Sequence, residues 1–198
     1  LRSETTVKVF DQMRKLQGFT DEGSPGRDWN VATGMVIEGK AGFQIMGDWA
    51  KGEFTAAGKQ PGVDYYCAAT PSNNGYLYNV DSFIFYKSDD ADKQAGQKLL
   101  AKLMMGKNFQ KVFNLYKGSI PARLDVSMDE FDQCAKKSNA DIKTAGAGGG
   151  LVPSFAHGMA QGNTMKAALQ DVITEHFNSD MSSVDAANAL ADSVLDNM

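Results

Sequence analysis

Apolar positions recur at helical spacing in most segments of this chain, and glycines or capping residues bound those segments. In residues 4–17, Val7 and Phe10 lie on one side and Gly18 is a favourable stop, which predicts an amphipathic helix. Polar side chains that can cap a first turn mark the start of several others. The predicted helices span 4–17, 29–38, 49–58, 91–105 and 107–116, one starting at Ser127, one over 155–178, and a last one opening with Ser182-Ser183-Val184-Asp185.

Short runs of β-branched and aromatic residues lie between these helices. Residues 41–46, 63–69 and 80–86 have this character and are predicted strands. Residues 144–150 are nearly all glycine and alanine, which predicts a hinge or an exposed loop. Helices that flank each short strand indicate an α/β layered architecture with an excess of helix.

Length and charge narrow the class of protein. The 198 residues are 42% hydrophobic, enough for the core of one large domain or parts of two. The net charge is −4 and no basic stripe is present, so nucleic acid is not an expected partner. No apolar run approaches the roughly 20 residues that span a bilayer. The chain opens on Leu1-Arg2-Ser3 and runs directly into a helical pattern, so we expect its start to be a cut point in a longer chain.

Two cysteines, Cys67 and Cys134, leave two interpretations open. They are either reduced core residues or a disulfide that closes a long loop, which would stabilise the fold by about 4 kcal/mol in the chain-entropy model. A disulfide would also imply an oxidising compartment. Metal binding is not favoured, because neither His157 nor His176 has ligand spacing to a cysteine.

One lysine and one tryptophan have the placement expected of ligand contacts. The run Lys117 to Arg123, with sequence KGSIPAR, brings a lysine to the end of a helix and turns the chain with glycine and serine. Such a lysine can direct several donors at one small polar ligand. Trp49 follows a Gly-Asp turn at the start of a helix, where it is either a core residue or a flat face that stacks on a sugar ring. For Trp29 the core interpretation is favoured.

Two further polar residues are candidates. Asp81 lies in the otherwise apolar run 80–86, where burying a carboxylate is costly unless it is paired. Hydroxyl donors of a ligand would satisfy it, and the alternative is an internal lysine or backbone groups. His157 follows Phe155, and its neutral imidazole can donate and accept at once, although a lone histidine is commonly structural. His176 has no such context and is interpreted as structural.

Nucleotide binding and catalysis receive little support. The run 146–150 fails as a dinucleotide motif, because the third glycine would fall on Leu151 and no strand precedes it. A glycosidase would need two facing carboxylates, and only Asp81 is a candidate. The polar residues therefore indicate a protein that binds a sugar and does not catalyse a reaction on it.

The chain resembles a known family at four blocks. They are Gly39 to Trp49, Asn79 to Phe83, Lys117 to Arg123, and Phe155 to Gly158. Together they are similar to the C-terminal part of a periplasmic sugar-binding protein of an ABC importer, from the family 1 extracellular solute-binding proteins. The spacing of Asp81, Lys117 and His157 resembles in particular the glucose/mannose-binding branch.

The resemblance implies a fold and a site. The fold would be α/β: a two-lobed periplasmic binding protein fold, truncated, with a helix-rich C-terminal lobe plus a returning segment of the N-terminal lobe. Residues 1–70 and 126–198 would form the C-terminal lobe, and residues 76–122 would belong to the N-terminal lobe. The sugar would lie in the cleft between the lobes. The implied ligand contacts are Trp49, Asp81, Lys117 and His157, with Asn79 as a further candidate.

The resemblance also implies a function. The protein would bind a monosaccharide, with glucose the expected sugar, and deliver it to the membrane permease of an ABC importer. We expect no enzyme activity, no cofactor and no metal, and a monomer. The compartment would be the periplasm, reached by a signal peptide in an N-terminal part outside this chain, and its oxidising environment favours a Cys67–Cys134 disulfide. The alternative is a carbohydrate-active enzyme domain or an accessory carbohydrate-binding module.

Overall fold

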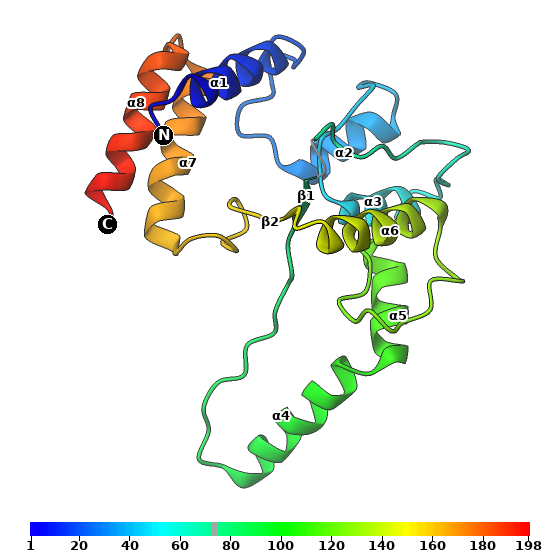
Figure 1. The fold of residues 1–198 in the computed structure, drawn as a ribbon. Helices are drawn as coiled ribbons and strands as arrows, with labels where there is room; N and C mark the ends of the chain where they lie inside the picture. Colours follow the sequence, from blue (N-terminus) through cyan, green and yellow to red (C-terminus); the bar gives the residue numbers. More distant parts are fainter. Residues whose placement is uncertain (73–74) are drawn as a thin grey trace. The chain divides into compact units, whose positions relative to one another are not determined.

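The computed structural model describes residues 1–72 and 75–198 (Figure 1). Within these residues the chain is mostly helical, with one short two-stranded sheet, so the helix-rich α/β class predicted from the sequence is confirmed. The elements are α1 (Glu4–Gln17), α2 (Trp29–Ile37), the 3-10 turn η1 (Asp48–Ala50), α3 (Lys51–Ala56), β1 (Tyr76–Tyr78), α4 (Ala91–Met104), α5 (Lys107–Lys117), α6 (Gln133–Ala147), β2 (Leu151–Pro153), α7 (Asn163–Asn178) and α8 (Ser183–Asp196).

The chain divides into two compact units. Residues 1–27 and 153–198 form the terminal unit, and residues 28–152 form the central unit. These boundaries differ from the predicted lobe boundaries near residues 70–76 and 122–126. The assignment of residues to two lobes stays a prediction.

The terminal unit is a bundle of α1, α7 and α8. Phe10 of α1 packs against Ala186 and Ala187 of α8, and all three are at most 3% exposed. Small alanines allow the two helices to approach closely, so the phenylalanine fills the space between them. The predicted start of the last helix is confirmed, since Ser182 Oγ accepts a hydrogen bond from the Asp185 N–H at 3.1 Å.

His176 of α7 is fully buried in this bundle. Its ring centroid lies 4.7 Å from that of Phe10, and its Nε2 lies 3.5 Å from Ser183 Oγ. Its Nδ1 has no hydrogen-bond partner among the described residues. Burial lowers the pKa of the imidazole below 6.5, and the nearby charge of Arg14 on α1 lowers it further. Asp11, also on α1, acts in the opposite direction. The neutral ring is therefore the form that the bundle accommodates.

We expect the stability of the terminal unit to fall as the pH drops below about 6.5. In that range His176 takes up a proton in the unfolded chain but stays neutral in the folded chain, so acid favours unfolding. The loss of stability ends only when the pH also falls below the pKa of His176 in the folded chain. Urea unfolding at a series of pH values between 7.5 and 5 would measure this loss. His176→Leu should flatten the dependence, and His157→Leu, at the other and exposed histidine, should leave it intact. A dependence that survives His176→Leu would contradict the prediction.

The central unit is built around η1 and α3. Phe54 of α3 is buried and stacks on Tyr65 with ring centroids 4.1 Å apart. Helix α3 packs against α2 and α5, and the start of α6 adds buried Cys134 and Ala135. None of the described helices in either unit has the length and apolar character needed to cross a membrane.

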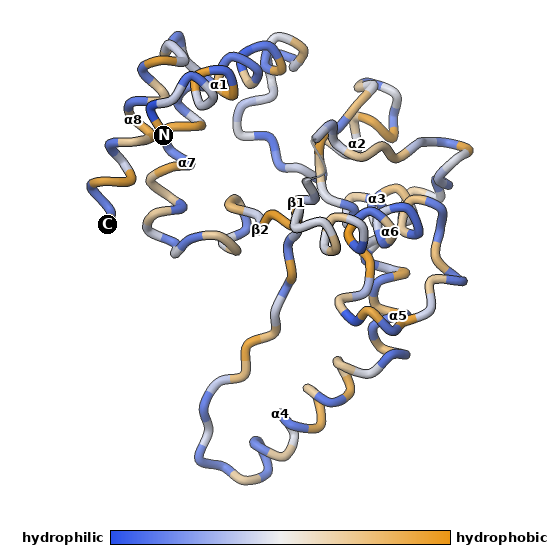
Figure 2. The backbone as a smooth tube through the Cα atoms, viewed as in Figure 1, coloured by the Kyte–Doolittle hydropathy of each residue, from blue (hydrophilic) through white to orange (hydrophobic). Residues whose placement is uncertain are grey.

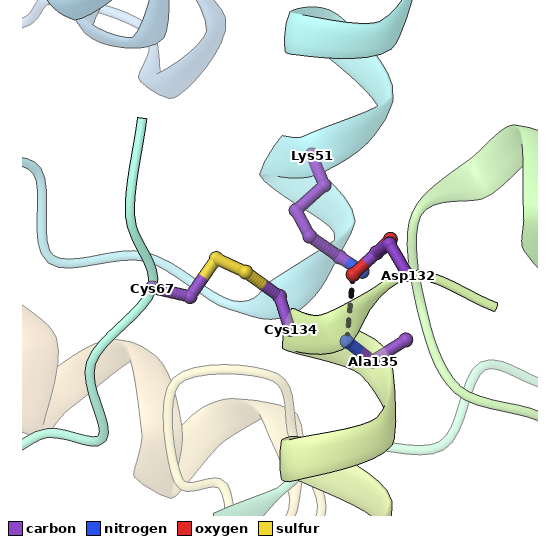
Figure 3. Close-up of a disulfide and its surroundings, with 5 residues drawn as sticks. All are labelled: Lys51, Cys67, Asp132, Cys134 and Ala135. Carbon is purple, nitrogen blue, oxygen red and sulfur yellow. Dashed lines mark hydrogen bonds and ion pairs between the residues drawn. A yellow bond between two sulfur atoms is a disulfide. The ribbon is translucent and has the colours of Figure 1, made fainter. Parts of the chain in front are cut away.

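One cluster joins distant segments of the central unit (Figure 3). A disulfide links Cys67, in an exposed loop, to Cys134 in the first turn of α6, with the Cα atoms 5.7 Å apart. Asp132 caps the same helix, since its Oδ1 accepts a hydrogen bond from the Ala135 N–H at 2.8 Å. Its Oδ2 accepts from the Nζ of Lys51, which is only 6% exposed. The cluster therefore ties α3, α6 and the loop at Cys67 together.

The three predicted strands are wrong for this structure. Residues 41–46, 63–69 and 80–86 form no strand, and the sheet instead pairs β1 with β2. A strand needs a neighbouring strand to satisfy its N–H and C=O groups, and the described residues provide none beside these segments. Phe43 and Ile84 are 96% and 76% exposed as a result.

Helix α4 also exposes large apolar side chains. Leu99, Leu100 and Leu103 are 71%, 45% and 60% exposed. Figure 2 shows hydrophobic positions along α4 and along the segment that leads from β1 to it. The amphipathic pattern thus predicted the helix correctly, but no described element covers the apolar side of α4.

Two predicted helices begin later than expected, and one predicted loop is partly helical. The helix expected from Ser127 begins at Gln133, because Ser127 Oγ bonds to Asp129 in a local turn and Asp132 is the N-cap. The helix expected over 155–178 begins at Asn163. The glycine-rich run 144–150 is helical up to Ala147, so only its last residues form the expected loop.

Candidate functional site

Lys117 is the last residue of α5. Gly118 follows with φ of +89°, a left-handed conformation that glycine adopts without strain, and its N–H bonds to the carbonyl of Asn114 at 2.9 Å. The turn halts the helix, as the sequence predicted. The Lys117 ammonium lies 5.8 Å from the ring centroid of Phe113, one turn earlier on the same helix.

Asp81 is the ion-pair partner of Lys117. The Nζ of Lys117 donates to Asp81 Oδ2, and the side-chain amide of Asn79 donates to Asp81 Oδ1 at 3.0 Å. The Asp81 side chain is 61% exposed, so it is not the buried strand carboxylate that the apolar run suggested. Pairing with an internal lysine was the alternative interpretation, and the structure contains that pair. Three of the predicted residues are thereby brought together.

Trp49 lies in η1 of the same unit. Its six-membered ring rests on the backbone of Gly47, because a Cβ atom placed at that glycine would come within 2.1 Å of the ring. Glycine at this position therefore allows the indole to fold back over the turn. The side chain of Trp49 is neither fully buried nor fully exposed, which a platform for a ligand requires.

The turn after Lys117 lies directly against the Trp49 segment. A Cβ atom at Gly52 would lie 2.8 Å from the carbonyl oxygen of Lys117, and one at Gly118 would lie 2.6 Å from the nitrogen of Gly52. Only glycines permit two backbones to approach this closely. The aromatic ring and the lysine therefore belong to one part of the central unit.

A residue that the sequence analysis treated only as part of a turn connects the two segments. Asp48 Oδ2 accepts a hydrogen bond from the N–H of Ile120 at 3.2 Å. Burial raises the pKa of the Asp48 carboxyl, while the charges of Lys51 and Lys117 act in the opposite direction. The buried hydroxyl of Ser119 also lowers this pKa. The only available signal was the position of a charged residue between Gly47 and Trp49.

His157 belongs to the terminal unit. It lies in the turn before α7, is exposed, and its Nδ1 is 2.7 Å from the hydroxyl of Ser154, which is 2% exposed. This contact orients the imidazole locally. The grouping of His157 with Trp49, Asp81 and Lys117 stays a prediction.

The residues gathered in the central unit can hold a polar, uncharged ligand. They offer a carboxylate acceptor, ammonium and amide donors, and an aromatic ring. Such a combination is typical of binding sites in which a few polar groups orient a ligand against an apolar wall. Among the described residues, no group of three or more His, Cys, Asp or Glu side chains could hold a metal ion. The use of these groups as a binding site stays a prediction.

Comparison with known proteins identifies the family. Residues 2–144 match the family of bacterial extracellular solute-binding proteins. The chain therefore belongs to this family, whose members are binding proteins.

Several curated relatives are similar over nearly the whole chain. A probable sugar-binding periplasmic protein of Brucella suis biovar 1 (strain 1330) is 47% identical over 195 residues, which are 98% of this chain and 46% of the relative. An ABC transporter extracellular-binding protein of Pyrococcus horikoshii is 32% identical over 171 residues, 86% of this chain and 38% of the relative. A xylose/arabinose-binding protein of Haloferax volcanii is 27% identical over 193 residues, 95% and 40% respectively. The chain thus spans about half the length of the curated relatives it matches, or less.

Proposed function

We propose that the protein containing this chain binds a monosaccharide, with glucose the first candidate, and delivers it to the permease of an ABC importer. The observation that carries the proposal is the Asn79–Asp81–Lys117 cluster, which lies in the same compact unit as Trp49, in a member of the solute-binding family. The names of the relatives from Brucella suis and Haloferax volcanii support a sugar, and the name of the Pyrococcus horikoshii relative supports an ABC transporter. The family supports export, and the proposed compartment is the periplasm.

The cluster suits a polyhydroxyl ligand. Asp81 has two carboxylate oxygens that can each accept from a sugar hydroxyl, and Lys117 can donate to hydroxyls or to the ring oxygen. Before the sugar binds, these two groups satisfy each other, so the ligand must supply partners to both charges when it enters. Hydroxyl pairs do this, whereas an apolar solute would leave a charge without a partner. The indole of Trp49 would stack on the apolar face of the sugar ring.

The proposed site lies between two lobes. Residues 1–70 and 126–198 would contribute Trp49 and His157, and residues 76–122 would contribute Asp81, Lys117 and Asn79. The exposed apolar side chains of the segment 80–86 and of α4 support this assignment, since the sheet of a second lobe would cover them. Closure of the lobes around the sugar would shift the population toward the form that the permease recognises.

The contacts of Asp81 favour sugar binding over the enzyme alternative. Hydrolysis of a glycoside requires a second carboxyl group facing the first. The side chain that pairs with Asp81 is the ammonium of Lys117. The geometry favours binding, and we propose neither catalysis nor a cofactor, with the protein acting as a monomer.

Calorimetric titration of the full-length protein tests the proposal. Glucose is titrated first, with galactose, mannose, maltose and xylose as comparators. One-to-one binding of glucose that is tighter than binding of the others is the expected result. Selective binding of another sugar would keep the class of protein and overturn glucose as the ligand. Binding of none of the five would overturn the proposed function.

Asp81→Ala in the full-length protein is expected to weaken sugar binding by about 1.5–3 kcal/mol, roughly 10- to 150-fold. The substitution removes the acceptor for two hydroxyls and leaves the Lys117 ammonium without its partner. Asp89→Ala, at an exposed aspartate of the same segment, is the matched control and should leave the affinity unchanged. Equal affinities of Asp81→Ala and the unaltered protein would contradict the assignment of the site.

A further inference from the structure

Asp48 is not one of the sugar contacts proposed above, but its carboxylate connects two segments that carry such contacts. Its Oδ2 accepts from the N–H of Ile120, 72 positions further along the sequence, at 3.2 Å. Asp48 is next to Trp49 in η1, and Ile120 is three residues after Lys117. One side-chain hydrogen bond thus connects the segment that carries the aromatic ring with the turn that carries the lysine.

The backbones of these two segments also approach each other closely. Gly52 and Gly118 lie so close that a Cβ atom at either would clash, at 2.8 Å with the Lys117 carbonyl and at 2.6 Å with the Gly52 nitrogen. The two glycines let the backbones approach, but they have no side chain that could make a directional contact. The hydrogen bond from Ile120 to Asp48 adds a directional contact.

The positive charges near Asp48 favour one location for its carboxylate. It lies near the ammonium groups of Lys51 and Lys117, and each of these has its own carboxylate partner, Asp132 and Asp81 respectively. Asp48 therefore adds attraction for Lys117 without competing for the same position. Loss of Asp48 would remove both the attraction and the acceptor for the turn.

We propose that Asp48 is a positioning residue for sugar binding, which fixes the Lys117 turn at the distance from Trp49 that the sugar requires. The inference rests on the proposed function. It assigns to Asp48 an effect on affinity that is exerted through Lys117 and not through contact with the ligand. The conservative variant Asp48→Asn keeps an oxygen acceptor for Ile120 and should keep most of the affinity, whereas Asp48→Ala loses it.

A double-mutant cycle in the full-length protein tests the proposal, with glucose as the probe and the other four sugars in reserve. Asp48→Ala should weaken binding about tenfold in the unaltered background. In a Lys117→Met background the same change should have no further effect, because the turn then carries no ammonium to position. A purely structural role would give the same loss in both backgrounds and would overturn the proposal. Asp89→Ala serves as the control in each background.

The outcomes separate this inference from the proposed function. If the unaltered protein binds none of the five sugars, the proposed function fails and the inference fails with it. If it binds sugar and Asp48→Ala binds equally well, only the inference fails. Should Asp48→Ala not fold, Asp48→Ser replaces it in the cycle, since the serine hydroxyl is too short to reach Ile120.

Discussion

Reduction of the Cys67–Cys134 disulfide is expected to lower the free energy of unfolding by about 4 kcal/mol. The bond joins residues 67 positions apart, so opening it releases a long loop in the unfolded chain. The folded chain gains little in return, because Cys134 stays buried in α6 and Cys67 is on an exposed loop. Urea unfolding of residues 1–198, followed by circular dichroism with and without reductant, measures the difference.

The serine double variant, Cys67→Ser with Cys134→Ser, is the control for this experiment. Its midpoint should match that of the reduced chain and should not respond to reductant. Intact mass provides a direct check, because reduction of the bond adds two hydrogen atoms. No gain in mass on reduction would show that the two cysteines are not joined, and equal midpoints of the oxidised and reduced chains would contradict the predicted stabilisation.

Asp132→Ala is expected to destabilise the chain by about 3–5 kcal/mol, because it removes the hydrogen-bonded carboxylate partner of the buried Lys51 ammonium. The same change removes the cap of α6, which contributes about 1 kcal/mol of that loss. Asp132→Asn should be milder, since its amide oxygen can still accept from the Ala135 N–H. The Lys51 side chain is 7% exposed and the Asp132 side chain 35%, so Lys51→Met should cost less than Asp132→Ala. Urea unfolding of the three variants measures this order.

An exposed pair of the same helix supplies the comparison. Lys137 and Asp141 form an (i, i+4) ion pair at 2.5 Å with side chains 51% and 35% exposed. Asp141→Ala should lower stability by no more than about 0.5 kcal/mol, because water replaces the lost partner. Similar losses for Asp132→Ala and Asp141→Ala would contradict the special role of the buried ammonium.

Helices were the predictable part of this fold because their signals are local. The stop at Gly18, the cap at Asp90 and the turn at Gly118 each lie within one turn of the helix that they end or begin, and α1, α4 and α5 follow the prediction closely. The strands were not predictable in the same way. Residues 80–86 have a strand composition, but pairing depends on a second segment, and none of the described residues supplies it.

In the candidate site, too, local features could be predicted and long-range contacts could not. The place of Lys117 at a helix end could be predicted from Gly118 alone. Its pairing with Asp81, 36 residues away, could be considered only as one of several alternatives. The bond between Asp48 and Ile120 could not be predicted, because a Gly-Asp-Trp turn has the same sequence whether or not a distant N–H donates to its carboxylate.

The two tryptophans of the chain, Trp29 and Trp49, both lie in the central unit. Indole fluorescence therefore reports on the central unit alone, whereas the helical signal in circular dichroism sums both units. Acid should then reduce the helical signal of the bundle around His176 before it changes the emission spectrum, and reductant should change the emission spectrum while the bundle stays folded. With Trp29→Phe, the remaining emission would come from Trp49 beside the proposed sugar site, so sugar binding could be followed without an added label.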